Sequence, residues 1–225
     1  MRGRTFVFGS SGFLFRSNKL MYDAQTLSLW NHMRGEPVVG PLADSGIRLP
    51  VRPVVTTTWQ QWLRVHPDTL VLDIDTGYTR DYTPGRPYGR YYASPDTMFP
   101  VSPRDSRLNA KDVVFVLRLP SAAKVYPLAA FAGEALVHDR VAGVDVLVMG
   151  QVSTRTVRAY RAEGLRFRAG PDGGTVVDGR GEAWAVEETA LVSRATGRRL
   201  ARLAGHLAYW FGWFAFHPDT PVYGR

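Results

Sequence analysis

A short segment that occurs twice constrains the fold of this chain more than any other feature. The residues WQQWLRVHPDT at 59–69 return as WFGWFAFHPDT at 210–220, near the end of the 225-residue sequence. Tryptophans three positions apart share one face of a helix, and proline disfavours helical geometry in the residue before it. We therefore predict two short Trp-faced helices, near 58–65 and 209–216, each ending at His-Pro-Asp-Thr. The repeated motif comprises Trp59, Trp62, His66 and Pro67, with Trp210, Trp213, His217 and Pro218 as counterparts.

The repeated motif carries further expectations about its surroundings. Thr57 and Gln60 have the spacing of a capping box at the start of the first helix. All four tryptophans are expected to be largely buried, and the two imidazoles to bond the last carbonyls of their helices. The apolar run LVLDI at 70–74 predicts a buried strand after the first helix.

A weaker similarity extends upstream of the motif. The residues LMYDAQTLSLW at 20–30 are echoed by ALVSRATGRRL at 190–200, with Thr26 opposite Thr196. The sequence therefore indicates an internal duplication, and duplicated units usually bury their cores against each other. We predict a first repeat over 1–77, a connector over 78–107 and a second repeat over 108–225, packed as one structural unit.

The two predicted repeats are unequal at their beginnings. Ahead of the shared part, residues 113–160 read as strands of period two with Gly and Pro turns, whereas nothing equivalent precedes residue 5. We expect that the chain begins inside its first repeat and that upstream sequence would resemble 113–160. A strand at 5–8 would then present an unpaired edge, which is a hazard for aggregation.

Composition favours a mainly β (β-rich α+β) fold, since 22 Gly and 15 Pro imply frequent turns and short elements. The formal net charge is +8, but the basic residues are scattered. A charged solvated surface explains them better than nucleic-acid binding, which stays an alternative. The absence of cysteine excludes disulfides, thiolate metal sites and cysteine nucleophiles within this chain. The longest apolar run, LAYWFGWFAF at 207–216, is too short to span a bilayer, and no signal-peptide pattern is visible at the start.

The densest polar set lies in the first repeat, where the chain must turn between residues 20 and 30. Asp23 and Thr26 suit an Asx-type turn. The alternative is the edge of a ligand pocket, in which polar groups give directed hydrogen bonds and an indole supplies the floor. The set comprises Asn18, Tyr22, Asp23, Thr26, Ser28 and Trp30, most of which the second repeat lacks.

Other candidate groups are sparser. His138 and Asp139 predict a turn or, alternatively, an imidazole oriented by its neighbouring carboxylate. Asp73 and Asp75 would share one face of the strand predicted around them, where they could bind a cation or act as an acid–base pair. The alternative is that they mark the exit of that strand into a turn. The GSSG sequence at 9–12 predicts a hairpin turn. No compact His, Asp or Glu spacing predicts a metal site.

The predicted connector is rich in Tyr, Pro and Arg. Disordered linkers are poor in aromatic residues, so we expect an ordered loop laid over the two repeats. Interleaved Tyr and Arg also suit stacking on sugars or bases.

Several long sequence stretches resemble the bacterial and archaeal family known as domain of unknown function 3179. They are SNKLMYDAQTLSLW at 17–30, TWQQWLRVHPDTLVL at 58–72 and YASPDTMFPV at 92–101. The resemblance implies relatives that are often exported or lipid-anchored, with no settled activity. It also implies a Cys-Pro-Leu element ahead of the FGSSG stretch. That region is missing from the first repeat, and in the second its place falls near Met149 and Gly150.

The function that these observations favour is a module that binds a small ligand or a protein partner, because no catalytic motif is present. The alternative is an enzyme, dependent on a metal or on the cysteine element in full-length relatives, of which this chain is an incomplete version. Binding to nucleic acid or an anionic surface is a second alternative. The sequence indicates no particular cofactor.

Overall fold

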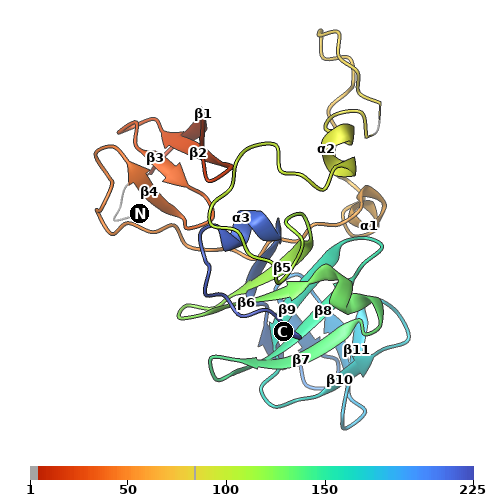
Figure 1. The fold of residues 1–225 in the computed structure, drawn as a ribbon. Helices are drawn as coiled ribbons and strands as arrows, with labels where there is room; N and C mark the ends of the chain where they lie inside the picture. The colour runs from red at the N-terminus through yellow and green to blue at the C-terminus, as the bar shows by residue number, and fades with distance from the viewer. Residues whose placement is uncertain (1–4, 84) are drawn as a thin grey trace.

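The computed structural model describes residues 5–83 and 85–225, and it confirms the mainly β fold. The strands of these residues form four antiparallel sheets. One sheet belongs to the first predicted repeat and three to the second, with helix α3 (Trp210–Phe214) between them (Figure 1). None of the described helices is long and apolar enough to cross a membrane.

The first sheet is a meander of four strands in the order β1-β2-β3-β4. Its strands are β1 (Phe8–Phe15), β2 (Asn18–Asp23), β3 (Leu29–Asn31) and β4 (Glu36–Val39). The buried Trp30 side chain lies at its centre, with the ring of Phe8 edge-on at 5.2 Å between centroids. The GSSG stretch is not the predicted hairpin turn, because it lies within β1, where the register with β2 shifts between Ser10 and Leu14.

The second predicted repeat begins with the strands expected over 113–160. These are β5 (Val113–Arg118), β6 (Ala123–Pro127), β7 (Leu136–Val141), β8 (Val144–Gln151) and β9 (Thr156–Arg161). The strand β15 (Ala204–Tyr209) completes a sheet in the order β15-β5-β6, and β7, β8 and β9 form another. A bridge between Tyr160 and Arg202, with a hydrogen bond of 2.8 Å from Leu203 N to Ala159 O, brings these sheets together.

The remaining sheet is a meander in the order β10-β11-β12-β13-β14. Its strands are β10 (Phe167–Ala169), β11 (Thr175–Asp178), β12 (Ala183–Val186), β13 (Ala190–Ser193) and β14 (Arg199–Ala201). Buried side chains of this sheet, such as Trp184 and Leu191, pack with Leu147 and Tyr160 from β8 and β9.

The strand β5 is buried on both faces. Alternate side chains of a strand point in opposite directions, and each face of β5 has its own packing partners. In β5, Phe115 and Leu117 pack into the core between the sheets, whereas Val114 and Val116 pack against α3. The strand β15 approaches closely enough that a Cβ atom on Gly205 would lie 2.4 Å from the ring of Phe115. A side chain at this position would therefore force the strands apart.

Both predicted Trp-faced helices are present, as α1 (Trp59–Val65) and α3. The start of α1 differs from the capping box that the sequence predicts, because Thr58 rather than Thr57 is the N-cap residue and its hydroxyl accepts from Gln61 N at 3.3 Å. Two further short helices are α2 (Gly89–Ala93) and the 3-10 helix η1 (Leu128–Ala132).

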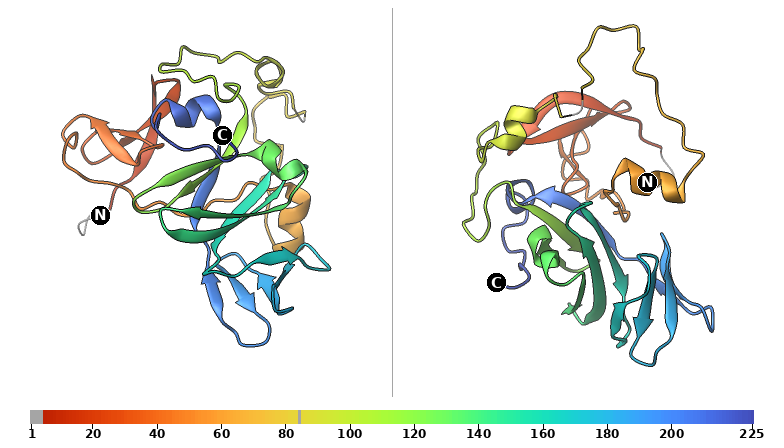
Figure 2. Two further views of the ribbon diagram at one scale, coloured as in Figure 1. Left: turned by 60° about the horizontal axis from the view of Figure 1, so that its bottom comes forward. Right: turned by 90° about the vertical axis from the view of Figure 1, so that its right-hand side faces the viewer.

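The buried strand predicted over 70–74 is wrong. These residues form no strand, and Leu70 and Leu72 are more than nine-tenths exposed, at 95% and 92%. Residues 75–83 and 85–88 extend away from the sheets (Figures 1 and 2). Val101, in the later part of the predicted connector, packs with Ala215 and Phe216, which directly follow α3.

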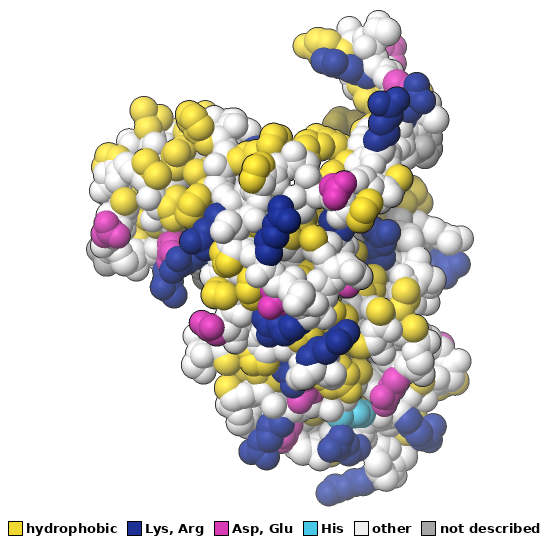
Figure 3. All heavy atoms as spheres, viewed as in Figure 1, with side chains coloured by type: hydrophobic (Ala, Val, Ile, Leu, Met, Phe, Trp, Pro, Cys, Tyr) yellow, Lys and Arg dark blue, Asp and Glu magenta, His cyan; other side chains and the backbone are white. Residues whose placement is uncertain are grey.

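The outer edge of β1 has no neighbouring strand among the described residues. The strand begins at Phe8 rather than at residue 5, although Val7 O accepts a hydrogen bond from Ala24 N at 2.8 Å. Phe13, Leu14 and Phe15 are all exposed, and hydrophobic side chains gather over this sheet in Figure 3. An unpaired edge with apolar side chains therefore exists here, although it starts further along the chain than the sequence predicts.

Candidate functional site

Four residues of the polar set predicted over 18–30, Asp23, Thr26, Ser28 and Trp30, form the interior of a tight turn between β2 and β3. Asp23 accepts hydrogen bonds from Thr26 N at 2.6 Å, from Thr26 Oγ1 at 2.9 Å and from Trp30 Nε1 at 2.8 Å. Ser28 Oγ bonds Thr26 Oγ1 at 2.7 Å and accepts from Leu42 N at 3.0 Å. Asp23, Ser28 and Trp30 are fully buried. The structure therefore brings these residues together as the predicted Asx-type turn.

The hydrogen bonds of the turn also determine the charge state of Asp23. Burial alone would raise the pKa of this carboxyl group, but the bonds from Trp30 and Thr26 outweigh burial and lower the pKa below its ordinary value. The carboxylate is therefore ionised at neutral pH, and the turn already occupies both of its oxygens.

Asn18 and Tyr22 lie outside this turn. Asn18 Nδ2 donates to Gly212 O in α3 at 3.4 Å, so it links the first sheet to the second repeat. The ring of Tyr22 covers Gly9, where an added Cβ atom would lie 2.5 Å from it. The predicted polar set is therefore divided between a turn, a contact between repeats and a contact between two strands.

The turn between β13 and β14 has the same form, with Ser193 in the place of Asp23. Ser193 Oγ accepts from Thr196 N at 2.9 Å and bonds Thr196 Oγ1 at 2.7 Å. The residue after the threonine has a left-handed backbone in both turns, with φ 58° at Leu27 and φ 73° at Gly197. Since the backbone bonds also correspond, the two segments that the sequence aligns have the same local structure.

His138 and Asp139 lie inside β7, so the turn predicted there is wrong. Neighbouring residues of a strand point to opposite faces, and the two side chains accordingly have separate partners. His138 Nε2 accepts from Phe167 N at 2.8 Å, whereas Asp139 accepts from Tyr126 Oη at 2.8 Å and pairs with Lys124 at 2.6 Å. Burial, with Arg166 nearby, lowers the pKa of His138. The carboxylate therefore does not orient the imidazole.

Helices α1 and α3 end in the same arrangement of side chains. Trp62 Nε1 donates to Thr69 Oγ1 at 2.9 Å, and Trp213 Nε1 donates to Thr220 Oγ1 at 3.0 Å. In each, the imidazole of the His-Pro sequence lies against the indole, with ring centroids 4.1 Å apart in the first and 3.9 Å apart in the second. The predicted bonding of these imidazoles to the last helix carbonyls is wrong, because the histidine backbone N–H groups make those bonds.

The two helices differ in what covers their tryptophans. Trp210 and Trp213 are buried, as predicted, whereas Trp59 is 49% exposed and Trp62 is 37% exposed. The prediction that all four tryptophans are buried is therefore wrong for α1. The side chains that cover α3 are Val114, Val116, Val125 and Val222, from β5, β6 and the segment after the helix.

Helix α1 contacts the rest of the protein through its polar side. Gln61 Nε2 donates to Gln151 Oε1 at 3.0 Å, and Gln61 Oε1 accepts from Thr156 Oγ1 at 3.1 Å. Thr57 Oγ1 joins this group by a bond of 2.6 Å to the same amide oxygen. These bonds attach α1 to the ends of β8 and β9 while its tryptophans remain accessible.

A group of partly buried basic side chains surrounds the buried Trp213. The ring of His206 lies 5.9 Å from the indole, and the guanidinium of Arg118 lies over the indole at 5.6 Å. Burial, together with Arg118 and the neighbouring histidines, lowers the pKa of His206 to about 4, and burial with the nearby arginines lowers the pKa of His217 to about 4. Both imidazoles are therefore neutral at pH 7.

Asp73 and Asp75 are exposed in the extended segment and form no pair on a strand, so that prediction is wrong. Across residues 5–83 and 85–225, no group of three or more His, Asp or Glu side chains could hold a metal ion.

The sequence patterns did not predict one polar contact, which joins the end of the predicted connector to α3 and the segment after it. Arg107 pairs with Asp105 at 3.0 Å, and Asp105 accepts a bond of 3.2 Å from Trp210 Nε1. Arg107 also donates to Thr220 O at 3.2 Å and to Pro218 O at 3.1 Å. The repeated motif marks Trp210 as important, but no spacing pattern links it to residues so far away in the sequence.

These features define a mainly β protein organised around two Trp-faced helix ends, one covered and one open. The chain belongs to the family described as protein of unknown function (DUF3179), whose model matches residues 1–220. This match confirms the resemblance seen in the sequence. Neither a curated protein nor a solved structure gives a significant match to the chain.

Proposed function

We propose that this protein is a binding module and that the exposed face of α1 binds a β-hairpin of a partner polypeptide. The observation that carries this proposal is the difference in cover between two helix ends with the same internal bonds. The binding face, here called the α1 face, consists of Trp59, Trp62, Val65, Leu70, Val71 and Leu72, all exposed.

The cover of α3 indicates what kind of partner would fit. Valines of an antiparallel pair, β5 and β6, pack on the α3 tryptophans. The segment after α3 then adds to the pair, since Val125 N donates to Pro221 O at 2.9 Å and Tyr223 N donates to Val125 O at 2.8 Å. Residues 70–72 are the sequence counterparts of 221–223 and have no such neighbour among the described residues.

Two physical arguments favour a hairpin over a small ligand at the α1 face. Large apolar side chains gathered on one surface mark interaction sites, and adding a strand to an exposed backbone edge supplies main-chain hydrogen bonds together with side-chain specificity. A hairpin with aliphatic residues at alternate positions would satisfy both needs. We include in this proposal that α1 and α3 belong to duplicated units, so that the cover of α3 indicates the partner of α1.

The test uses a labelled peptide with the sequence of residues 112–128, which contains β5 and β6, and measures its binding to the full chain by fluorescence polarisation. We expect saturable binding that is lost in Trp62→Ala. The matched control is Phe13→Ala, which removes an exposed aromatic ring from β1 and should leave binding unchanged.

A second peptide separates specific docking from general stickiness. In it, the positions of Val114, Val116 and Val125 carry Asn, so that the face toward the helix becomes polar. We expect no binding of this peptide. Equal binding of both peptides, or binding that survives Trp62→Ala, would contradict the proposal.

A further inference from the structure

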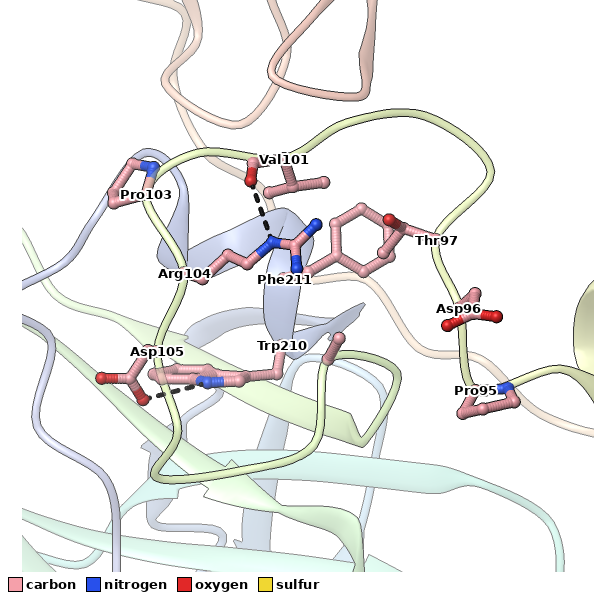
Figure 4. A pocket seen from close by; sticks show the side chains of 10 residues that line it. Pro95, Asp96, Thr97, Val101, Pro103, Arg104, Asp105, Trp210 and Phe211 are labelled. Atoms are coloured by element: carbon pink, nitrogen blue, oxygen red, sulfur yellow. Dashed lines mark hydrogen bonds between the residues drawn. The ribbon is translucent and has the colours of Figure 1, made fainter.

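A cavity of 260 Å³ lies between α3 and residues 95–105 (Figure 4). Its lining includes Asp96, Thr97, Arg104, Asp105, Trp210 and Phe211. Pockets for small organic molecules typically measure about 300–1,000 Å³, so this one suits a ligand of a few heavy atoms. It is separate from the α1 face.

The apolar wall of the cavity is held rigidly. Trp210 N donates to Asp112 O and Phe211 N donates to Ala110 O, both at 2.9 Å, so the first turn of α3 is fixed to the segment ahead of β5. The indole is held at its other end by the bond from Nε1 to Asp105. A wall that is already in position loses little conformational entropy when a ligand binds.

One charged pair at the cavity is fully used within the protein. Both carboxylate oxygens of Asp105 accept from Arg107 Nε at 3.0 Å, and the terminal nitrogens of Arg107 donate to the carbonyls of Thr220 and Pro218. Asp105 and Arg107 therefore compensate each other and leave no net charge for a ligand.

Arg104 is different, because most of its donors are free. Its Nε donates to Val101 O at 3.3 Å, whereas its terminal nitrogens have no hydrogen-bond or ion-pair partner among residues 5–83 and 85–225. Figure 4 shows the guanidinium directed into the cavity beside Phe211 and Thr97. A guanidinium with free terminal nitrogens binds a carboxylate through two parallel hydrogen bonds.

An acceptor lies across the cavity from this donor. Asp96 is exposed, and from residues 5–83 and 85–225 its carboxylate accepts only a side-chain bond of 3.4 Å from Ser94 Oγ. In Figure 4 it lies on the side opposite Arg104, with Thr97 next to it. The cavity therefore offers a positive group, a negative group and an aromatic wall to one small molecule.

We propose that this pocket binds a small zwitterion of the amino-acid class, whose carboxylate pairs with Arg104 and whose ammonium group pairs with Asp96. The apolar part of the ligand lies against Trp210 and Phe211. The opposite charges on the two sides of the cavity select such a molecule over a simple anion or a simple amine, because only the zwitterion satisfies both groups at once.

The test measures the thermal melting of the full chain, and then titration calorimetry, with a panel of free amino acids. Each hit is compared with its N-acetyl derivative and its carboxamide. We expect an apolar amino acid to bind, and each derivative to bind at least about tenfold more weakly, the loss expected for one charge-assisted hydrogen bond.

Variants assign the contacts. Arg104→Gln should weaken the free amino acid at least about tenfold and abolish its advantage over the carboxamide, and Arg104→Lys should recover part of the affinity. Asp96→Asn should abolish the advantage over the N-acetyl derivative. Arg90→Gln, which changes an arginine of α2 outside the cavity, is the control and should bind as the unaltered chain does.

Several outcomes would overturn the proposal. These are no binding by any member of the panel, equal binding of acetate or a simple amine, and affinity that Arg104→Gln leaves unchanged. Circular dichroism of each variant establishes that it has folded, so that loss of binding is not confused with loss of structure.

Discussion

Trp62 and Trp213 donate the same hydrogen bond to the same threonine of their His-Pro-Asp-Thr sequences, yet Trp213 is fully buried and Trp62 is 37% exposed. The local structure of a helix end is therefore independent of whether the helix has a core to join. The valines of β5 and β6 make the difference at Trp213.

Truncating these two tryptophans should have unequal effects on stability. Trp213→Ala leaves a cavity among Val114, Val116 and Val125 and should reduce the free energy of unfolding by about 3–5 kcal/mol. Trp62→Ala removes a half-exposed ring and should cost less than about 1 kcal/mol. Urea denaturation followed by circular dichroism gives both values, and equal losses would contradict the difference in burial.

Replacing Asp23 tests the turn between β2 and β3. Asp23→Ala leaves the buried Nε1 of Trp30 without an acceptor, and an unsatisfied buried donor costs about 1–3 kcal/mol. Asp23→Ser copies the second repeat, where Ser193 bonds the corresponding threonine. We expect its melting temperature to lie between those of Asp23→Ala and the unaltered chain. A melting temperature below that of Asp23→Ala would contradict the equivalence of the two turns.

Two partly buried histidines should make stability depend on pH. The folded protein holds the pKa of His206 and of His217 at about 4, compared with 6.5 for a free imidazole. The unfolded chain therefore binds more protons between these values, and stability rises with pH wherever the unfolded state binds more protons. The histidine contribution should be fully present above about pH 6.5 and lost as the pH falls toward 4.

Urea midpoints measured from pH 7 to pH 4.5 check this dependence. His206→Gln and His217→Gln should each flatten the curve in this window. A curve of unchanged slope in both variants would show that other groups cause the pH dependence.

Arg107 should hold the end of the connector on α3. Arg107→Ala removes the ion pair with Asp105 and the bonds to the carbonyls of Pro218 and Thr220. We expect residues 95–107 to be cleaved faster in limited proteolysis and the melting temperature to fall. Arg90→Ala is the control on the exposed helix α2 and should be cleaved in this segment at the original rate.

The repeated sequence was sufficient to predict both helices, because proline and the spacing of the tryptophans act within one or two turns of chain. The bounds differ from the prediction, since α1 begins at Trp59 instead of residue 58 and α3 covers Trp210–Phe214 instead of 209–216. The turn at Asp23 was predictable for the same reason, since its partners Thr26 and Trp30 lie within seven residues. The strands over 113–160 followed from their period-two pattern. In contrast, Asp105, Arg107 and Trp210 meet only because β15 returns to pair with β5, and no local pattern encodes that return.

Local patterns in the sequence were enough to predict the mainly β class and the two short helices, and a long matching pattern indicated the family. Only the tertiary structure decided which tryptophans are buried and that residues 70–74 form no strand. It also decided that His138 and Asp139 face opposite ways. The physical reason is that burial and strand pairing require a partner surface, and α1 has none where α3 has β5 and β6.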